Sequence, residues 1–356
     1  MRIGELCSYA PKSTIKAGEA VDGAKYMFFT SSADESKRYT EYQYDGEGII
    51  MGTGGNATLH YYSGKYAVST DCLVLVPRGN IRCKYLYYYL KANMTVLEAG
   101  FKGAGLKHTN KKYISDIDVN TVPDFCKQDE IIAILDKLNA VINSRKQELQ
   151  LLEDLVSARF VEMFGAVEQN PFEWDMSSVG KLISSCEAGW SGNGTQRAKR
   201  DGEIAVLRVS AVTKGYFIPD ECKVLDDQST IKKYVYPEKG DLLFSRANTR
   251  EMVGATAVIT RDYPEYILPD KLWKIRFTDT VNVWYMKYVL SSESIRSIFS
   301  SVSTGTSGSM FNVSMEKFKA IMIPLPPIEL QEQFADFVKG LGKSKLMQQY
   351  IYNIFI

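Results

Sequence analysis

A proline-containing junction occurs twice in this chain and limits the ways in which it can fold. The stretch 120–135 reads NTVPDFCKQDEIIAIL, and the stretch 323–338 reads IPLPPIELQEQFADFV. In both, a strand-like end leads through proline into an amphipathic helix, with Gln128 near the start of the first helix and Gln331 near the start of the second. Because proline cannot donate to a β-ladder and fixes its own φ, each junction predicts a hinge between a globular unit and a helix.

The residues before the two junctions also correspond, which predicts an internal duplication. The matched anchors are IGEL (3–6) with VGKL (179–182), Tyr42–Gly52 with Tyr234–Phe244, Tyr66 with Tyr266, and Tyr85, Tyr88 and Leu90 with Tyr285, Tyr288 and Leu290. A repeat this long is a domain duplication rather than a solenoid, whose units span about 20 to 50 residues. We therefore expect an α+β chain with two similar mixed α/β units, at 1–122 and 165–325.

A heptad pattern follows the first junction and begins again after the second. Apolar residues occupy Ile131, Leu135, Leu138, Ile142, Leu149, Leu152 and Val156 in the first helix, and Phe334, Val338 and Leu341 in the second. This 3-4 spacing predicts a coiled-coil seam. The alternative is a helix lying on its own domain, but about 35 to 40 helical residues would be longer than such a unit is wide. We expect helices at 123–164 and 326–356 to pair antiparallel, with the units at opposite ends and related by a pseudo-twofold axis.

Composition excludes several classes of protein. No stretch approaches the roughly 18 apolar residues that a membrane span needs, and the N-terminus lacks a signal-length apolar run, so we expect a cytoplasmic protein without a membrane partner. Six cysteines and two histidines occur without the ligand spacing of a zinc site, which predicts free, buried thiols and no bound metal. The 43 basic and 42 acidic residues nearly cancel, so the net charge does not identify a partner.

The glycine-rich and acidic motifs do not support catalysis. GLGKSK (340–345) has Phe337 where a phosphate loop needs its leading glycine, and MGTGGNATLH (51–60) lacks the GxGxxG order of a dinucleotide site. NPFEW (170–174) lacks the second proline of an amino-methyltransferase motif, and Glu221–Lys223 lacks room for the turn between the acids of a nuclease. These absences predict no catalytic residues in this chain.

Polar and basic loops remain as candidate binding sites. Cations neutralise phosphates, and Arg, Asn, Ser and Thr can hydrogen-bond to base edges in the major groove. A solvated turn is the alternative for each loop alone, but the recurrence of such loops in both copies favours DNA binding. The candidate residues are Thr53, Asn56, Lys102, Lys107, His108 and Lys111 in the first copy, and Arg197, Arg200, Arg208, Arg246, Asn248, Arg250, Thr304, Thr306 and Ser307 in the second.

The order of these segments resembles one known family. ARFVEMFG (158–165), NPFEW (170–174) and the closing IPLPPIELQEQF (323–334) are similar to the specificity subunit of type I restriction-modification systems. The resemblance implies two target recognition domains that each read one half of a bipartite sequence in double-stranded DNA, held apart by paired helices. It implies as partners two methyltransferase subunits, which carry S-adenosylmethionine, and restriction subunits, which use ATP and Mg; this chain would bind no cofactor itself.

Two rival interpretations stay open from the sequence. One is a stand-alone nucleic-acid-modifying enzyme whose active site has no familiar motif, and the other is a scaffold without nucleic-acid contact. Methyl transfer by the purified chain would favour the first. If the chain retained no DNA on a filter at either low or high salt, the second would be favoured. A DNA-binding protein would retain DNA at low salt and lose it at high salt, because phosphate contacts make DNA binding salt-dependent.

Overall fold

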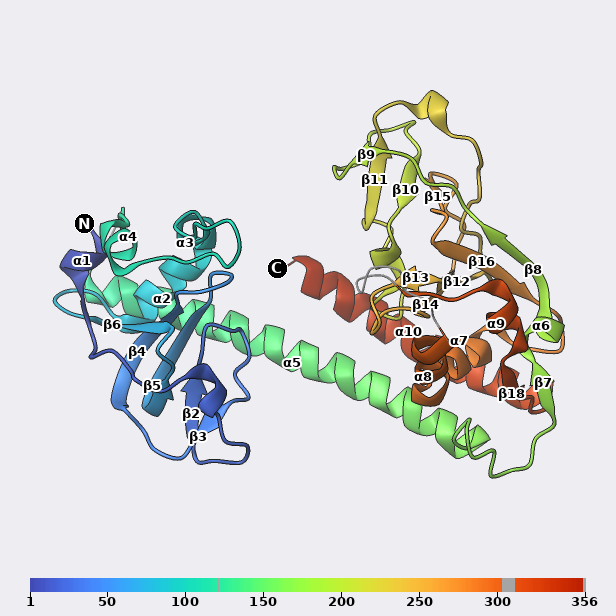
Figure 1. The fold of residues 1–356 in the computed structure, drawn as a ribbon, viewed down its shortest axis with the longest axis horizontal. Helices are drawn as coiled ribbons and strands as arrows, with labels where there is room; N and C mark the ends of the chain where they lie inside the picture. Colours follow the sequence, from blue (N-terminus) through green and yellow to red (C-terminus); the bar gives the residue numbers. More distant parts are fainter. Residues whose placement is uncertain (121, 303–310, 355–356) are drawn as a thin grey trace. The chain divides into compact units, whose positions relative to one another are not determined.

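The computed structural model describes residues 1–120, 122–302 and 311–354, without the side chains of 302 and 342–354. The chain divides into two compact units, unit 1 at Met1–Ser144 and unit 2 at Arg145–Ile356. The long helix α5 (Phe125–Phe164) begins in unit 1 and ends in unit 2 (Figure 1).

Unit 1 is built on a six-stranded sheet covered by helices. The strands follow the order β1 (Cys7–Tyr9), β6 (Cys72–Pro77), β4 (Tyr44–Gly52), β5 (Leu59–Val68), β2 (Tyr26–Phe29) and β3 (Arg38–Tyr39), and only β2 and β5 run parallel. The helices are α1 (Ile3–Leu6), the 3-10 turn η1 (Ala17–Glu19), α2 (Cys83–Ala92), α3 (Met94–Glu98) and α4 (Lys111–Asp116). Figure 1 shows α2 on the sheet, where it contacts β4, β5 and β6.

Successive apolar side chains of β4 lie on opposite faces of the sheet, and both faces are buried. Ile49 and Met51 belong to the core cluster that includes Leu86 of α2, whereas Ile50 belongs to a second cluster with Phe29 on the other face. Successive side chains of a strand point to opposite faces, so an apolar run of this kind needs cover on both sides.

Unit 2 contains two four-stranded sheets. The first has the order β14 (Thr256–Val258), β12 (Leu242–Ser245), β16 (Leu272–Phe277) and β8 (Ile183–Ala188); the second has β15 (Tyr266–Ile267), β10 (Ala205–Leu207), β11 (Cys222–Leu225) and β9 (Gly194–Thr195). Two short pairs join β13 (Ala247–Asn248) to β17 (Phe311–Asn312) and β18 (Met322–Pro324) to β7 (Met176–Ser178). The helices are α6 (Val179–Leu182), η2 (Val209–Val212), η3 (Gln228–Thr230), α7 (Val283–Ser291), α8 (Glu293–Val302), α9 (Met315–Ala320) and α10 (Ile328–Ile354).

The predicted repeat is visible in the packing of the first helix of each unit. Ile3 N donates to Ile117 O at 3.0 Å, and Val179 N donates to Ile321 O at 2.8 Å. The next residue is glycine in both copies, because a Cβ on Gly4 would lie 3.1 Å from Ser115 Cβ and one on Gly180 would lie 2.9 Å from the Cβ of Lys319. The same close approach of two short helices is therefore built twice.

Strand pairing corrects one part of the predicted repeat by a single residue. Gly52 pairs with Cys72, and Ser245 pairs with Leu272. Cys72 and Leu272 are as far apart in the sequence as the matched Tyr66 and Tyr266, so we take them as corresponding residues. Their strand partners, Gly52 and Ser245, then correspond, and the predicted match of Gly52 with Phe244 is wrong. β12 is a shorter version of β4. The residues just before β12 form a loop, whereas the residues at the matching place in unit 1 already belong to β4.

The two hinges are closed by the same hydrogen-bond network around a fully buried glutamine. In unit 1, Gln128 Oε1 accepts from Arg82 N at 2.7 Å, and Nε2 donates to the carbonyls of Asn80 and Pro123 at 2.8 and 2.7 Å. Each glutamine thus ties its long helix both to the preceding hinge and to the turn that starts a second helix.

In unit 2 the corresponding side chain makes the equivalent contacts. Gln331 Oε1 accepts from Asn282 N at 2.8 Å, and Nε2 donates to Pro326 O at 2.8 Å and to Thr280 O at 3.5 Å. Arg82 and Asn282 are the N-caps of α2 and α7, so the two networks join equivalent elements.

Within unit 2, the end of α5 packs against α10. Phe160 and Phe164 have ring centroids 5.5 Å from that of Phe334, and the Arg159 guanidinium lies 5.9 Å from the Phe337 ring. From Phe334 to Phe337 the residue number rises along α10, while the number of the contacted residue on α5 falls to Arg159. The two segments therefore run antiparallel. Phe160 and Phe164 lie outside the predicted seam.

The predicted seam residues are all at least half-buried, but they pack in different places. Val156, Phe334 and Val338 belong to the main core cluster of unit 2, and Leu341 packs against it. Ile131 packs against the core of unit 1. Leu135, Leu138, Ile142, Leu149 and Leu152 are half-buried along α5.

The cysteines are free, and their burial differs. Cys7, Cys72, Cys83 and Cys222 are buried and Cys186 is half-buried, but the prediction of burial is wrong for Cys126, which is exposed in the first turn of α5. Burial raises the pKa of the Cys7 and Cys83 thiols to about 12. These two thiols therefore stay protonated and unreactive at neutral pH.

Replacing the hinge glutamine should destabilise unit 2. Gln331→Ala leaves the Asn282 N–H and the Pro326 carbonyl buried without their partner, and each such group costs about 1–3 kcal/mol. We expect a clear loss in the free energy of unfolding measured by denaturant titration. Gln333→Ala on the exposed face of the same helix is the matched control and should change it by less than about 0.5 kcal/mol; equal effects of the two changes would contradict the assigned role of Gln331.

Candidate nucleic-acid interface

In unit 1, the structure brings two separate candidate loops together. The loop after β4 (52–58) and the loop before α4 (100–110) are joined by main-chain hydrogen bonds, and we call them the loop pair of unit 1. Gly55 N donates to Lys107 O at 2.9 Å, and Thr109 N donates to Thr53 O at 3.0 Å. Lys102 and His108 exchange two bonds of 3.0 Å, which close the second loop on itself.

Unit 2 has an equivalent loop pair, formed by 246–250 after β12 and 311–313 before α9. Val313 N donates to Arg246 O at 2.9 Å, as Thr109 N does to Thr53 O. Arg246 N donates to Lys271 O at 3.1 Å, as Thr53 N does to Asp71 O at 2.8 Å. The same main-chain framework therefore carries a different set of side chains in each unit.

The positions in the two loop pairs match residue by residue. Gly54 stands two residues after the end of β4 and pairs with His108; Ala247 stands two residues after the end of β12 and pairs with Asn312. His108 and Asn312 also stand two residues before the N-caps of α4 and α9, Asn110 and Ser314, whose side chains accept from the amides of Tyr113 and Lys317. Asn312 and Phe311 are candidate site residues of this loop pair that were not predicted from the sequence.

Side-chain anchors fix the first strand of each loop pair. Thr53 Oγ1 donates to Asp71 O at 2.9 Å, and Arg246 Nε donates to Asp270 O at 2.9 Å. Asn248 is also engaged within its loop, because its Oδ1 accepts from Thr249 N at 2.9 Å and its Nδ2 faces Ser245 Oγ at 3.4 Å. These side chains hold the loops in place, which leaves the other positions to contact a ligand.

Several basic and polar side chains of the loop pairs are exposed. Lys102, Lys107 and His108 are exposed, and among the described residues Lys102 and Lys107 have no carboxylate partner. Arg250 is exposed, with its guanidinium 6.0 Å from the Phe311 ring. Asn56 is an exposed polar residue at the tip of the first loop.

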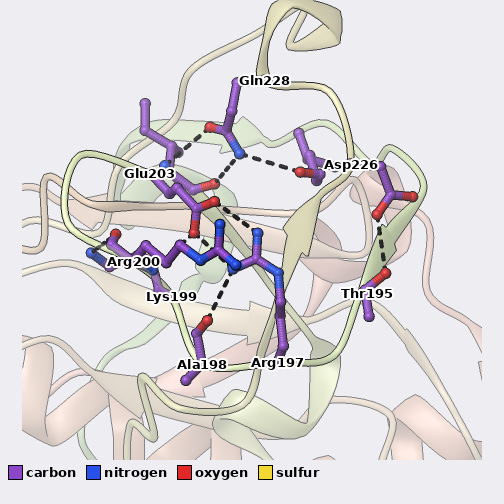
Figure 2. A network of polar contacts seen from close by, with 10 residues as sticks. Thr195, Arg197, Ala198, Lys199, Arg200, Glu203, Asp226 and Gln228 are labelled. Atoms are coloured by element: carbon purple, nitrogen blue, oxygen red, sulfur yellow. Dashed lines mark hydrogen bonds and ion pairs between the residues drawn. The ribbon is translucent and has the colours of Figure 1, made fainter.

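Other predicted site residues lie elsewhere. Arg197 forms a bidentate pair with Glu203 at 2.8 and 2.7 Å beside the second sheet of unit 2, as Figure 2 shows. Arg208 pairs with Glu221 at 3.2 Å across β10 and β11. These two charges are already matched by carboxylates, so neither residue is a free cation in the structure.

Arg200 and Lys111 are also outside the loop pairs. Arg200 N donates to Glu203 Oε2 at 2.8 Å in the network of Figure 2, and its side chain is exposed. Lys111 holds its ammonium 4.3 Å from the centre of the Tyr9 ring. Thr304, Thr306 and Ser307 lie outside the described residues.

The described parts of the chain offer neither a metal site nor a membrane segment. In these parts, no group of three or more His, Cys, Asp or Glu side chains could hold a metal ion. No helix there combines the length and the apolar character needed to cross a membrane.

The fold and the loop pairs define a duplicated, sheet-based protein in which each unit carries one equivalent loop pair. The family model described as "Type I restriction modification DNA specificity domain" matches residues 1–154 and 172–354, and the chain belongs to this family. It is similar to the EcoKI specificity subunit of Escherichia coli (strain K12), with 23% identity over 346 residues that cover 94% of this chain and 71% of that protein.

Other similarities differ in extent. The EcoEI specificity subunit of Escherichia coli is 25% identical over 184 residues, which cover 49% of this chain but only 31% of that protein. This chain therefore matches about a third of the length of that relative. The crystal structure of a type I restriction-modification S subunit from M. genitalium aligns with a TM-score of 0.61 at 12% identity, covering all of this chain and 92% of that one, and it supports the fold.

The ion pair in Figure 2 generates a pH prediction. Hydrogen bonds from the Arg197 side chain and the Arg200 amide lower the pKa of Glu203 from its ordinary 4.5 to about 2. A lowered acid pKa contributes stability above the unfolded value and loses it as pH falls from 4.5 towards 2. In Arg197→Ala, the Glu203 carboxyl should titrate closer to 4.5 in carbon-detected NMR, whereas Arg200→Ala keeps the backbone donor and should change its pKa less. An unchanged Glu203 pKa in Arg197→Ala would contradict the ion pair.

Proposed function

We propose that this chain is the non-catalytic, DNA-reading subunit of a type I restriction-modification complex, and that each unit reads one half of a bipartite target. The observation that carries the proposal is the loop pair, which has the same main-chain framework in both units and different side chains on it. A duplicated frame with varied side chains is suited to two half-sites of different sequence, because base contacts specify locally.

The side chains of the loop pairs fit the two kinds of DNA contact. Lys102 and Lys107 suit phosphates, which attract cations irrespective of sequence. Arg250 and Asn312 suit base edges, because arginine forms paired hydrogen bonds with guanine and asparagine with adenine. With a net charge of only +1, this chain would share the binding of the phosphate backbone with other subunits.

The long helices would set the distance between the half-sites. In this proposal the recognition domains are 1–122 and 165–325, and the helical segments 123–164 and 326–356 form an antiparallel coiled coil. Support comes from α5, which continues from one unit into the other, and from the antiparallel contact of its end with α10 at Phe334. The remaining half-buried seam positions of α5 would complete this packing.

Catalysis would reside in partner subunits. Two methyltransferase subunits would carry S-adenosylmethionine, and restriction subunits would use ATP and Mg; family membership supports this division. The first test is incubation of the purified chain with labelled S-adenosylmethionine and DNA. We expect no incorporation by the chain alone and incorporation after the methyltransferase subunits are added. Methyl transfer by the chain alone would instead favour the stand-alone enzyme.

A second test separates the loss of one half-site, caused by releasing the unit 2 loop, from the loss of phosphate binding. In the complex with methyltransferase subunits, Arg246→Ala should relax or abolish recognition of the half-site read by unit 2 and leave the other half unchanged, because it removes the anchor to Asp270. Lys107→Ala should weaken binding to all sequences and reduce the salt slope by about 1. Selection from randomised sites and binding at several salt concentrations measure these effects. Arg261→Ala, on an exposed residue that lies against Tyr263, is the control and should change neither; altered bases in both halves for Arg246→Ala would contradict one half-site per unit.

A further inference from the structure

We infer that His108 and Asn312 are corresponding specificity-determining residues of the two units, and that Asn312 reads an adenine. The inference rests on the proposed function and assigns base reading to one matched position. Both residues pair with the residue that follows β4 or β12 by two positions, and both precede an N-cap by two positions. The fold therefore presents their side chains from the same place on the framework.

The main chain beneath both side chains is fixed. His108 N and O each bond to Lys102 at 3.0 Å, and Thr109 N bonds to Thr53 O. Asn312 lies in β17, paired with Ala247, and the next residue donates from Val313 N to Arg246 O at 2.9 Å. A reading side chain must project from a rigid support to discriminate between bases, and each of these positions has one.

The opposing residue is matched in size to each side chain. A Cβ added to Gly54 would lie 3.2 Å from His108 Cε1, so glycine makes room for the imidazole ring. At the equivalent place in unit 2, Ala247 is almost fully buried and faces the smaller Asn312. The pairs Gly54 with His108 and Ala247 with Asn312 occupy the same place on the framework. We call these two pairs modules and expect them to be exchangeable.

Asn312 keeps the hydrogen-bonding capacity that base reading needs. Within 1–120, 122–302 and 311–354, no residue hydrogen-bonds to its side-chain amide, and it is half-exposed. The amide of Asn248, in contrast, is used within its own loop. An asparagine amide donates one bond and accepts another, which matches N7 and N6 of adenine in the major groove.

The test uses the full chain in complex with its methyltransferase subunits and selection from randomised DNA. Asn312→Ala should reduce the preference for one adenine in the half-site of unit 2 by about 10- to 100-fold. Asn312→Asp keeps the shape but loses the donor, so it should lose the same adenine while the complex keeps its melting temperature. Asn193→Ala, an exposed asparagine between β8 and β9, is the matched control and should leave both half-sites unchanged.

Exchange of the modules tests the correspondence. Asn312→His with Ala247→Gly should change the same single position in the unit 2 half-site, and His108→Asn with Gly54→Ala should introduce an adenine preference in the other half. Unchanged preference in Asn312→Ala and Asn312→Asp, or changes in the wrong half, would overturn the inference. If the unaltered complex shows no bipartite preference, the proposed function fails as well, so the two failures can be told apart.

Discussion

The repeated architecture depends on one buried polar side chain at each hinge. A proline junction alone would not fix the orientation of the long helix, because proline lacks a backbone N–H donor and adds no hydrogen bond in its place. Gln128 and Gln331 restrain it with three hydrogen bonds each, to the hinge and to the turn before α2 or α7. Since a buried amide tolerates no missing partner, these bonds fix the angle at which each helix leaves its unit.

The loop pairs follow the same logic, with fixed main chain and variable side chains. Their framework consists of backbone bonds such as Thr109 N to Thr53 O and Val313 N to Arg246 O, which any residue except proline in the donor position can make. Side chains on the framework can therefore change without loss of the fold. This separation explains how two units with little sequence in common carry equivalent loop pairs.

Much of the fold could be predicted from the sequence because it depends on local signals. The hinge prolines, the glutamines and the aromatic spacing of α2 and α7 all lie within a few residues of the elements they mark. The ion pairs of Arg197 and Arg208 could not be predicted, since Glu203 and Glu221 come within reach only once the loop closes and β10 pairs with β11. Asn312 was missed although its distance from the α9 cap offered a signal.

The corresponding tyrosines of α2 and α7 contact the long helices by different chemistry and at different positions along those helices. In unit 1, Tyr88 on α2 donates to Asp136 Oδ1 at 2.6 Å, and Lys84 donates to Oδ2 of the same carboxylate at 2.7 Å. In unit 2, Tyr288 on α7 lies edge-on to Phe334, with ring centroids 5.2 Å apart. Partial burial opposes ionisation of Asp136, but the hydrogen bonds from Lys84 and Tyr88 outweigh it and lower the pKa of this carboxyl. Salt screens a partly exposed ion pair, so we expect rising ionic strength to weaken the polar link between α5 and α2 in unit 1 more than the aromatic contact in unit 2.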